Sequence, residues 1–195
     1  MSEAEPKIIE ERGPFKVTSR EIKHDRFSMQ WIADEVIRPD GSPGEYFWIN
    51  FPRQAVLIFP IDDKGNIYLA EEFNYAANEY SPVVAGGVID EGESAVEAAK
   101  RELKEELGIE VEPQLWYIDT TKEVTNRVNN RTHLFLAKVK SVGEASLEPG
   151  EDIKLKKVPI EEAYQMVLNR KIQTATVKTG ILQIKLLLDS LKNVR

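Results

Sequence analysis

The sequence predicts an α+β fold in which a mixed β-sheet lies between helices. Three observations predict this class. Short apolar or alternating runs typical of strands fill much of the first 75 residues and recur after residue 110. One glutamate-rich helical segment separates these two groups of strands. Two helical segments follow the last strand, so the order differs from the regular strand–helix alternation of a doubly wound parallel sheet.

The individual elements are predicted from local patterns. Residues 15–38 alternate in places, as half-buried strands do, and the turn-rich residues 39–44 lead into a strand at 46–50, which indicates a hairpin. Pro159, followed by acidic residues, marks the start of a helix. Further strands are expected at 54–61, 67–73, 111–124, 132–139 and 153–158, and an amphipathic helix at 176–191. We therefore expect a flexible tail at 1–13, an N-terminal strand extension at 14–50 and a main domain at 51–195.

Composition excludes several classes of protein. The formal net charge is −7, and the 195 residues include no cysteine. An acidic chain lacks the excess of Lys and Arg that a large nucleic-acid footprint requires, and a chain without cysteine has no disulfide, zinc thiolate or cysteine nucleophile. The N-terminus lacks the apolar core of a signal peptide, and no apolar run approaches the length of a membrane span. We expect a cytoplasmic protein that binds neither nucleic acid nor membranes.

The most informative segment is residues 86–109, GGVIDEGESAVEAAKRELKEELGI. Ser94 and Glu97 have the spacing of a capping box, and Gly108 is typical of the left-handed residue that ends a helix. A helix is therefore predicted from Ala95 to Leu107. Its predicted buried flank consists of Val96, Ala99, Leu103 and Leu107.

Carboxylates gather on another flank of this helix. Glu102, Glu105 and Glu106 follow i, i+3, i+4 spacing and should project together, while Arg101 offsets part of their repulsion. Glu93, at the junction of loop and helix, adds a further carboxylate. Clustered carboxylate oxygens are ligands that Mg²⁺ or Mn²⁺ prefers, although a glutamate-rich face of a helix can also simply face solvent.

These residues also match a known family. Gly87, Glu93 and the run Arg101–Ile109 resemble the complete Nudix box. The resemblance implies the Nudix fold and hydrolysis of a diphosphate bond by water with bound Mg²⁺ or Mn²⁺. It implies metal ligands at Glu102, Glu105 and Glu106, with the carbonyl of Gly86 as a further ligand, and a Glu93–Arg101 charge pair that holds the loop on the helix.

Outside the box, the chain resembles the nucleoside diphosphate sugar branch, above all ADP-ribose pyrophosphatases. In that branch N-terminal strands build a homodimer that shapes the nucleobase site, and a loop glutamate can act as general base. Glu151 is the candidate here, with Glu148 and Asp152 behind it. The candidate catalytic residues are thus Glu105, Glu151, Arg101 and Glu93. Two features depart from the branch: no proline follows the box at about fifteen residues, and Asn74 replaces an arginine common before it.

Four residues are candidates for substrate binding: Trp31, Phe73, Arg127 and Arg131. The aromatic side chains could stack on a nucleobase, and the arginines could reach a phosphate or ribose. His133 is expected to be structural. The predicted substrate is a nucleoside diphosphate sugar such as ADP-ribose. The alternatives are another nucleotide diphosphate (ADP-glucose, GDP-mannose or a dinucleotide), a non-catalytic nucleotide-sensing domain, and a scaffold whose glutamates only face solvent.

Overall fold

The computed structural model describes residues 7–147, 149–150 and 152–192. The chain divides into two compact units. One contains the N-terminal residues up to Arg53 together with Lys122–Asn130, and the other contains Gln54–Thr121 and the chain from Arg131 onward. Each unit is built around its own sheet.

The first unit is a five-stranded sheet in the order β1-β2-β3-β4-β10. Its strands β1–β4 are antiparallel, and β10 runs parallel to β4. The predicted strands of the hairpin region are confirmed, whereas no strand was predicted at β1 or β10, which are too short for a recognisable pattern. The strands are β1 (Glu10–Arg12), β2 (Phe15–Arg26), β3 (Met29–Ile37), β4 (Pro43–Asn50) and β10 (Val128–Asn129).

A buried polar cluster holds this sheet together. The Asp34 carboxylate accepts two hydrogen bonds from the Arg20 guanidinium, at 2.7 and 2.9 Å, and one from the Trp48 indole N–H at 3.0 Å. Because Asp34 is buried, these donors replace the water that the carboxylate loses on folding.

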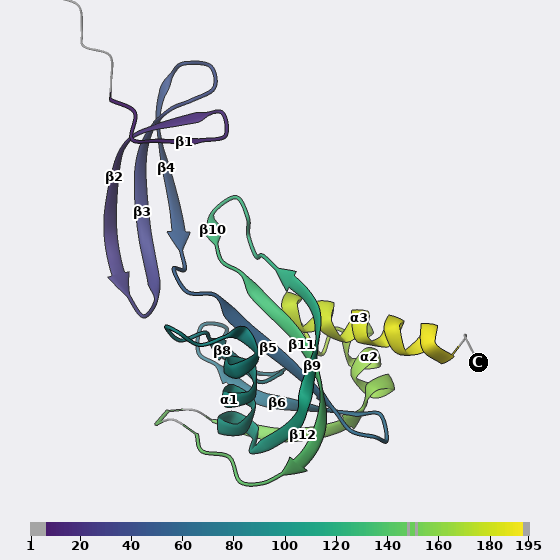
Figure 1. Cartoon of the computed structure of the whole chain (residues 1–195). Coiled ribbons are helices and arrows are strands. Elements are labelled where there is room, and N and C mark those ends of the chain that lie inside the picture. Colours follow the sequence, from purple (N-terminus) through teal and green to yellow (C-terminus); the bar gives the residue numbers. More distant parts are fainter. Residues whose placement is uncertain (1–6, 148, 151, 193–195) are drawn as a thin grey trace, which may run out of the picture. The chain divides into compact units, whose positions relative to one another are not determined.

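The second unit contains a mixed sheet with the path β12-β6-β5-β11-β9, to which β7 adds beside β6 and β8 beside β5 (Figure 1). Strands β5 and β11 are parallel, and the remaining pairs are antiparallel. The predicted mixed sheet is confirmed; β7 and β8 were not predicted. The strands are β5 (Ala55–Ile61), β6 (Asn66–Asn74), β7 (Glu79–Val83), β8 (Gly86–Val88), β9 (Ile109–Thr121), β11 (Thr132–Val142) and β12 (Ile153–Pro159).

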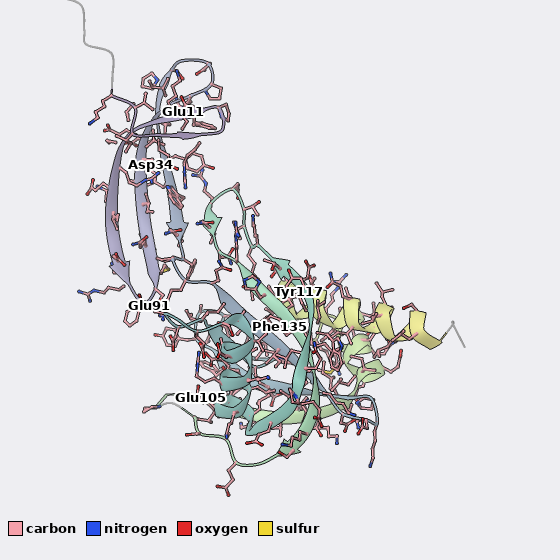
Figure 2. The ribbon with its side chains drawn as sticks, in the orientation of Figure 1. Glu11, Asp34, Glu91, Glu105, Tyr117 and Phe135 are labelled. Atoms are coloured by element: carbon pink, nitrogen blue, oxygen red, sulfur yellow. The ribbon has the colours of Figure 1, made fainter. Side chains whose placement is uncertain are left out.

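Helices cover both faces of this sheet, as expected. The helices are α1 (Ala95–Leu107), α2 (Ile160–Leu168) and α3 (Ala175–Lys192). Successive residues of β5 point to opposite faces: Val56 and Ile58 join the core beneath α1, whereas Phe59 joins the core beneath α2 and α3. The same alternation continues in β11, where Phe135 packs edge to face on Tyr117 of β9 (Figure 2). Among the described residues, no helix is long and apolar enough to cross a membrane.

The limits of α1 agree with the prediction, but its buried flank differs in one residue. Val96 is 36% exposed, and Ala98 is buried in its place beside Ala99, Leu103 and Leu107. The helix is rotated so that its small alanines face the sheet. This rotation brings the helix backbone close to β5 and β8, which places the glutamate flank beside the glycines of β8.

Candidate active site

Caps at both ends fix the helix that carries the glutamates. Ser94 Oγ accepts a hydrogen bond from the Glu97 N–H at 3.2 Å, and the Glu97 carboxylate accepts one from the Ser94 N–H at 2.9 Å. At the other end Gly108 is left-handed, with φ of 63°. Both expected caps are confirmed, and they define where the glutamates project from the chain.

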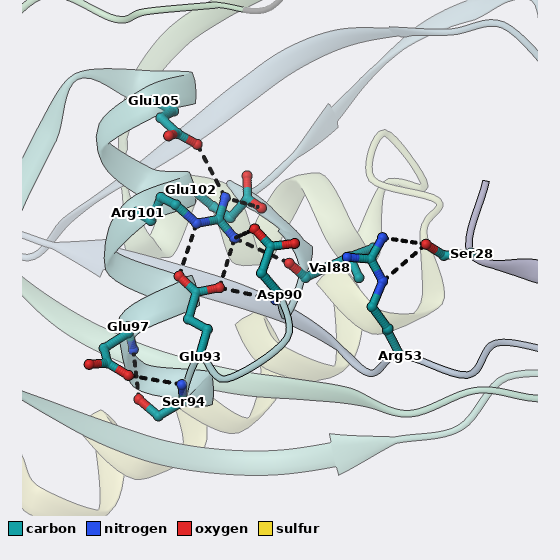
Figure 3. A network of polar contacts seen from close by, with 10 residues as sticks. All are labelled: Ser28, Arg53, Val88, Asp90, Glu93, Ser94, Glu97, Arg101, Glu102 and Glu105. Atoms are coloured by element: carbon teal, nitrogen blue, oxygen red, sulfur yellow. Dashed lines mark hydrogen bonds and ion pairs between the residues drawn. The ribbon is translucent and has the colours of Figure 1, made fainter.

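Arg101 is the centre of a polar network (Figure 3). Its Nε donates to Glu93 Oε1 at 2.9 Å and its Nη2 to Glu93 Oε2 at 3.0 Å, a bidentate pair. Its Nη1 donates to Glu102 at 2.8 Å and to Glu105 at 3.2 Å. The geometry of the expected Glu93–Arg101 pair is therefore present, and the same guanidinium also orients two glutamates of the cluster.

The loop contributes contacts that sequence reasoning missed. The Val88 carbonyl accepts a hydrogen bond from Arg101 Nη2 at 3.2 Å, and Asp90 Oδ2 lies 3.8 Å from the same nitrogen. The Glu93 carboxylate also accepts from the Asp90 N–H at 3.1 Å. No periodicity signals such contacts, because they depend on how the loop folds back onto the helix.

Gly87 leaves room for the Glu102 carboxylate. A methyl group on the Gly87 Cα would lie 2.1 Å from Glu102 Oε1 and 2.4 Å from its Cδ. The Glu102 side chain is only 14% exposed. The glycine of β8 and the glutamate of α1 are thus matched in space, which explains why a residue without a side chain occupies position 87.

Glu106 faces the neighbouring glycine of the same strand. The Gly86 N–H donates to Glu106 Oε2 at 3.2 Å. Glu105 is more open, with half of its side chain exposed. The three glutamates predicted as metal ligands therefore lie along one flank of α1, beside β8.

The two glutamates that Arg101 contacts most closely differ in the direction of their pKa shifts. Hydrogen bonds from Arg101 lower the pKa of Glu93, so this carboxylate stays charged. The Glu93 contact in turn raises the pKa of Arg101 far above any physiological pH. Burial raises the pKa of Glu102 and outweighs the opposing effect of Arg101. A buried carboxylate of this kind is stabilised by a further cation.

The donor set fits a divalent cation that keeps part of its water. Within the part of the chain that the structure describes, no three acidic or histidine side chains form a ready-made metal cage. Mg²⁺ in phosphate-processing sites is bound by a few carboxylates together with substrate oxygens and water, not by a complete protein cage. Glu102, desolvated and next to Glu105 and Glu106, meets that requirement.

Two of the predicted substrate-binding residues meet in the first unit. Trp31 of β3 and Arg127 line one cavity of about 450 Å³ together with Phe47. Arg127 donates to the Phe47 carbonyl at 3.1 Å, and its guanidinium lies 4.8 Å from the centre of the Tyr46 ring. An exposed indole near an arginine provides a surface on which a planar ring could stack.

The remaining candidates lie in the second unit or outside the described residues. Phe73 packs edge to face on Tyr80 with ring centres 5.2 Å apart, and Arg131 is exposed. Both ring nitrogens of His133 are hydrogen bonded, one to Thr120 and one to Gln54. Glu151, the candidate for general base, and Glu148, one of the two residues behind it, are not among the residues that the structure describes.

The chain matches a known protein family over most of its main domain. The family model of the NUDIX domain matches residues 51–177, more than half of the chain. The chain therefore belongs to the Nudix family and is a Nudix hydrolase.

Two curated relatives and one solved structure are similar to the chain. The ADP-ribose pyrophosphatase of Bacillus subtilis (strain 168) is 27% identical over 164 residues, which is 82% of this chain and 88% of the relative. The methanol dehydrogenase activator of Bacillus methanolicus is 26% identical over 158 residues, covering 79% and 83%. A crystal structure of an ADP compounds hydrolase superposes with a TM-score of 0.77 at 22% identity, covering 90% and 94%. That structure supports the fold.

Proposed function

We propose that this Nudix hydrolase cleaves the diphosphate bond of a nucleoside diphosphate sugar such as ADP-ribose, giving a nucleoside monophosphate and a sugar phosphate. The oxygen of a water molecule forms a bond to one phosphorus, and the bond from that phosphorus to the bridging oxygen breaks. The single observation that carries the proposal is the Arg101 network, which holds Glu102 and Glu105 on the flank of α1 that also carries Glu106.

Glu102, Glu105 and Glu106 would hold Mg²⁺ or Mn²⁺, with the Gly86 carbonyl as a further ligand. When bound, the cation lowers the pKa of water and neutralises charge on phosphate oxygens. Arg101 and Glu93 fix the loop and orient the ligands. Glu151 remains our candidate for the proton acceptor.

The relatives support the choice of substrate. The relative from Bacillus subtilis is named for ADP-ribose, and the solved structure is named for ADP compounds. The cavity lined by Trp31 and Arg127 offers an aromatic ring and a cation, which suit a base and a phosphate. We also assign substrate binding to Phe73 and Arg131.

We further propose that the protein is a cytoplasmic homodimer, and light scattering in solution tests the dimer directly.

The second candidate is a different nucleotide diphosphate within the same chemistry, which Asn74 favours because the arginine common in the ADP-ribose branch is absent there. A non-catalytic nucleotide sensor is the third. It is less well supported, because a protein that only binds a nucleotide has no need for three glutamates and an arginine that orients two of them.

A substrate panel tests all three. Release of nucleoside monophosphate is measured with and without Mg²⁺ from ADP-ribose, ADP-glucose, GDP-mannose and a dinucleotide. The Glu106→Gln variant removes one charge from the proposed metal site. Glu110→Gln is the matched control, because Glu110 is exposed and pairs only with Lys104 at 3.1 Å among the described contacts. We expect turnover by the parent and by Glu110→Gln, and loss of it in Glu106→Gln. Equal activity of both variants would disprove the proposed site.

A further inference from the structure

The segment that joins β11 to β12 is attached at its first end to the last turn of α1. The Gly143 N–H donates to the Gly108 carbonyl at 2.8 Å, and the Ser146 N–H donates to the Glu105 carbonyl at 2.7 Å. Gly108 permits this close approach, since a methyl group there would lie 2.6 Å from the Gly143 oxygen. The start of the segment is thus connected to the backbone of a proposed metal ligand.

The other end of the segment is attached to β7. Strand β6 lies between β12 and β7, with Ile153 opposite Glu72 and Tyr80 opposite Phe73. One step along the antiparallel register places Asp152 in the same cross-strand row as Phe73 and Tyr80, and residues in one row point to the same face of a sheet. The Tyr80 hydroxyl donates a hydrogen bond to Asp152 Oδ2 across this row.

Two neighbours hold the Tyr80 ring in place. Phe73 packs against it with ring centres 5.2 Å apart and an interplanar angle of 62°, and the Lys154 ammonium lies 5.1 Å from its centre. The hydrogen bond to Asp152 raises the pKa of Tyr80, so the hydroxyl remains a donor throughout the neutral range. Tyr80 is about half exposed. The side chain belongs to neither of the two buried core clusters.

We propose that Tyr80 is a positioning residue for the hydrolytic reaction. Through Asp152 it fixes where the chain enters β12, and the same connection is bonded at its start to the backbone of Glu105 in α1. The inference rests on the proposed function, since the position of the segment affects turnover only if α1 carries the reaction. Small displacements of reacting groups lower turnover strongly even when binding is unchanged.

The test replaces the hydroxyl alone. In Tyr80→Phe we expect kcat to fall about tenfold, equivalent to about 1.4 kcal/mol, while KM and the thermal midpoint stay at the parent values. Tyr75→Phe is the matched control, because Tyr75 is 91% exposed. Asp152→Ala, which leaves no side-chain acceptor for the Tyr80 hydroxyl, should show the same loss as Tyr80→Phe. The double variant should be no slower than either single variant, because both changes remove one interaction.

Hydrogen–deuterium exchange of the 143–152 backbone provides a readout that does not depend on activity. We expect faster exchange in Tyr80→Phe than in the parent and in Tyr75→Phe. Three results would each overturn the proposal. The kcat of Tyr80→Phe could change by less than twofold, its KM and thermal midpoint could change in parallel with kcat, or the losses of kcat in the double variant could be additive. If the parent cleaves nothing on the substrate panel, the proposed function and the role of Tyr80 in turnover both fail. The exchange rates then decide whether Tyr80 still anchors the segment, and unchanged exchange would overturn the anchor as well.

Discussion

Replacement of Gly87 by alanine should weaken metal binding much more than it weakens the fold. The added methyl group would lie 2.1 Å from Glu102 Oε1, and contacts under 3.0 Å are essentially never seen for a real Cβ, so the carboxylate must move by about 1 Å. The atoms that the added methyl group meets are the end of the flexible Glu102 side chain. The loss of stability should therefore remain within about 1–2 kcal/mol, near the low end for overpacking. The displaced carboxylate, however, is a proposed metal ligand.

The expected loss of metal affinity is about 10- to 100-fold, the range seen when groups that orient a metal ligand are altered. Mn²⁺ binding is measured by calorimetry without substrate, and Mg²⁺ dependence is measured on the active substrate. Gly143→Ala is the matched control, since a methyl group there meets its nearest atom, the Gly108 oxygen, at an ordinary 3.6 Å. If Gly87→Ala and Gly143→Ala bind Mn²⁺ within twofold of each other, the link between Gly87 and the metal site is refuted.

Three other predictions concern stability. Gly180→Ala should destabilise the protein by about 1–3 kcal/mol, because its methyl group would lie 2.0 Å from Cζ of the buried Phe59 ring; urea unfolding measures this, and a loss below 0.5 kcal/mol on that same scale contradicts it. Ser94→Ala should cost about 0.5–2 kcal/mol by loss of the helix cap, measured the same way, with Ser94→Gly expected to lose less. Burial raises the pKa of Asp34, but hydrogen bonds, led by those from Arg20, lower it by a larger amount. The pKa of Asp34 is therefore below its usual value. A lowered folded pKa means that this stabilisation is present above about pH 4 and is lost as the pH falls towards the folded value. Acid unfolding of Asp34→Asn should therefore depend less on pH than that of the parent, and equal slopes would contradict the assignment.

Local patterns were enough to predict the limits and caps of α1 and the flank from which its glutamates project. The capping pair Ser94 and Glu97, the stop at Gly108 and the i, i+3, i+4 glutamates each depend on residues within a few positions of one another. Such signals are present in the sequence itself, because helix periodicity and caps are properties of a short stretch of chain. The strands of the main sheet were predicted for the same reason, from short apolar runs and from β-branched and aromatic residues.

Contacts between distant residues were not available from these patterns. The parallel pairing of β10 with β4 joins segments about 80 residues apart, and β7 and β8 are too short to show a period. The exposure of Val96 depended on how α1 rotates against the sheet. Strand register and helix rotation are set by packing of the whole core, which a short window of sequence does not contain.

The sequence by itself determined the family motif, the helix and the residue types that can hold a divalent cation. Only the tertiary structure decided how Arg101 divides its hydrogen bonds among Glu93, Glu102 and Glu105, and how Gly87 leaves room for the Glu102 carboxylate. The physical reason is that spacing places side chains on one face of a helix, whereas their distances, burial and partners depend on the strands and loops that pack against that face.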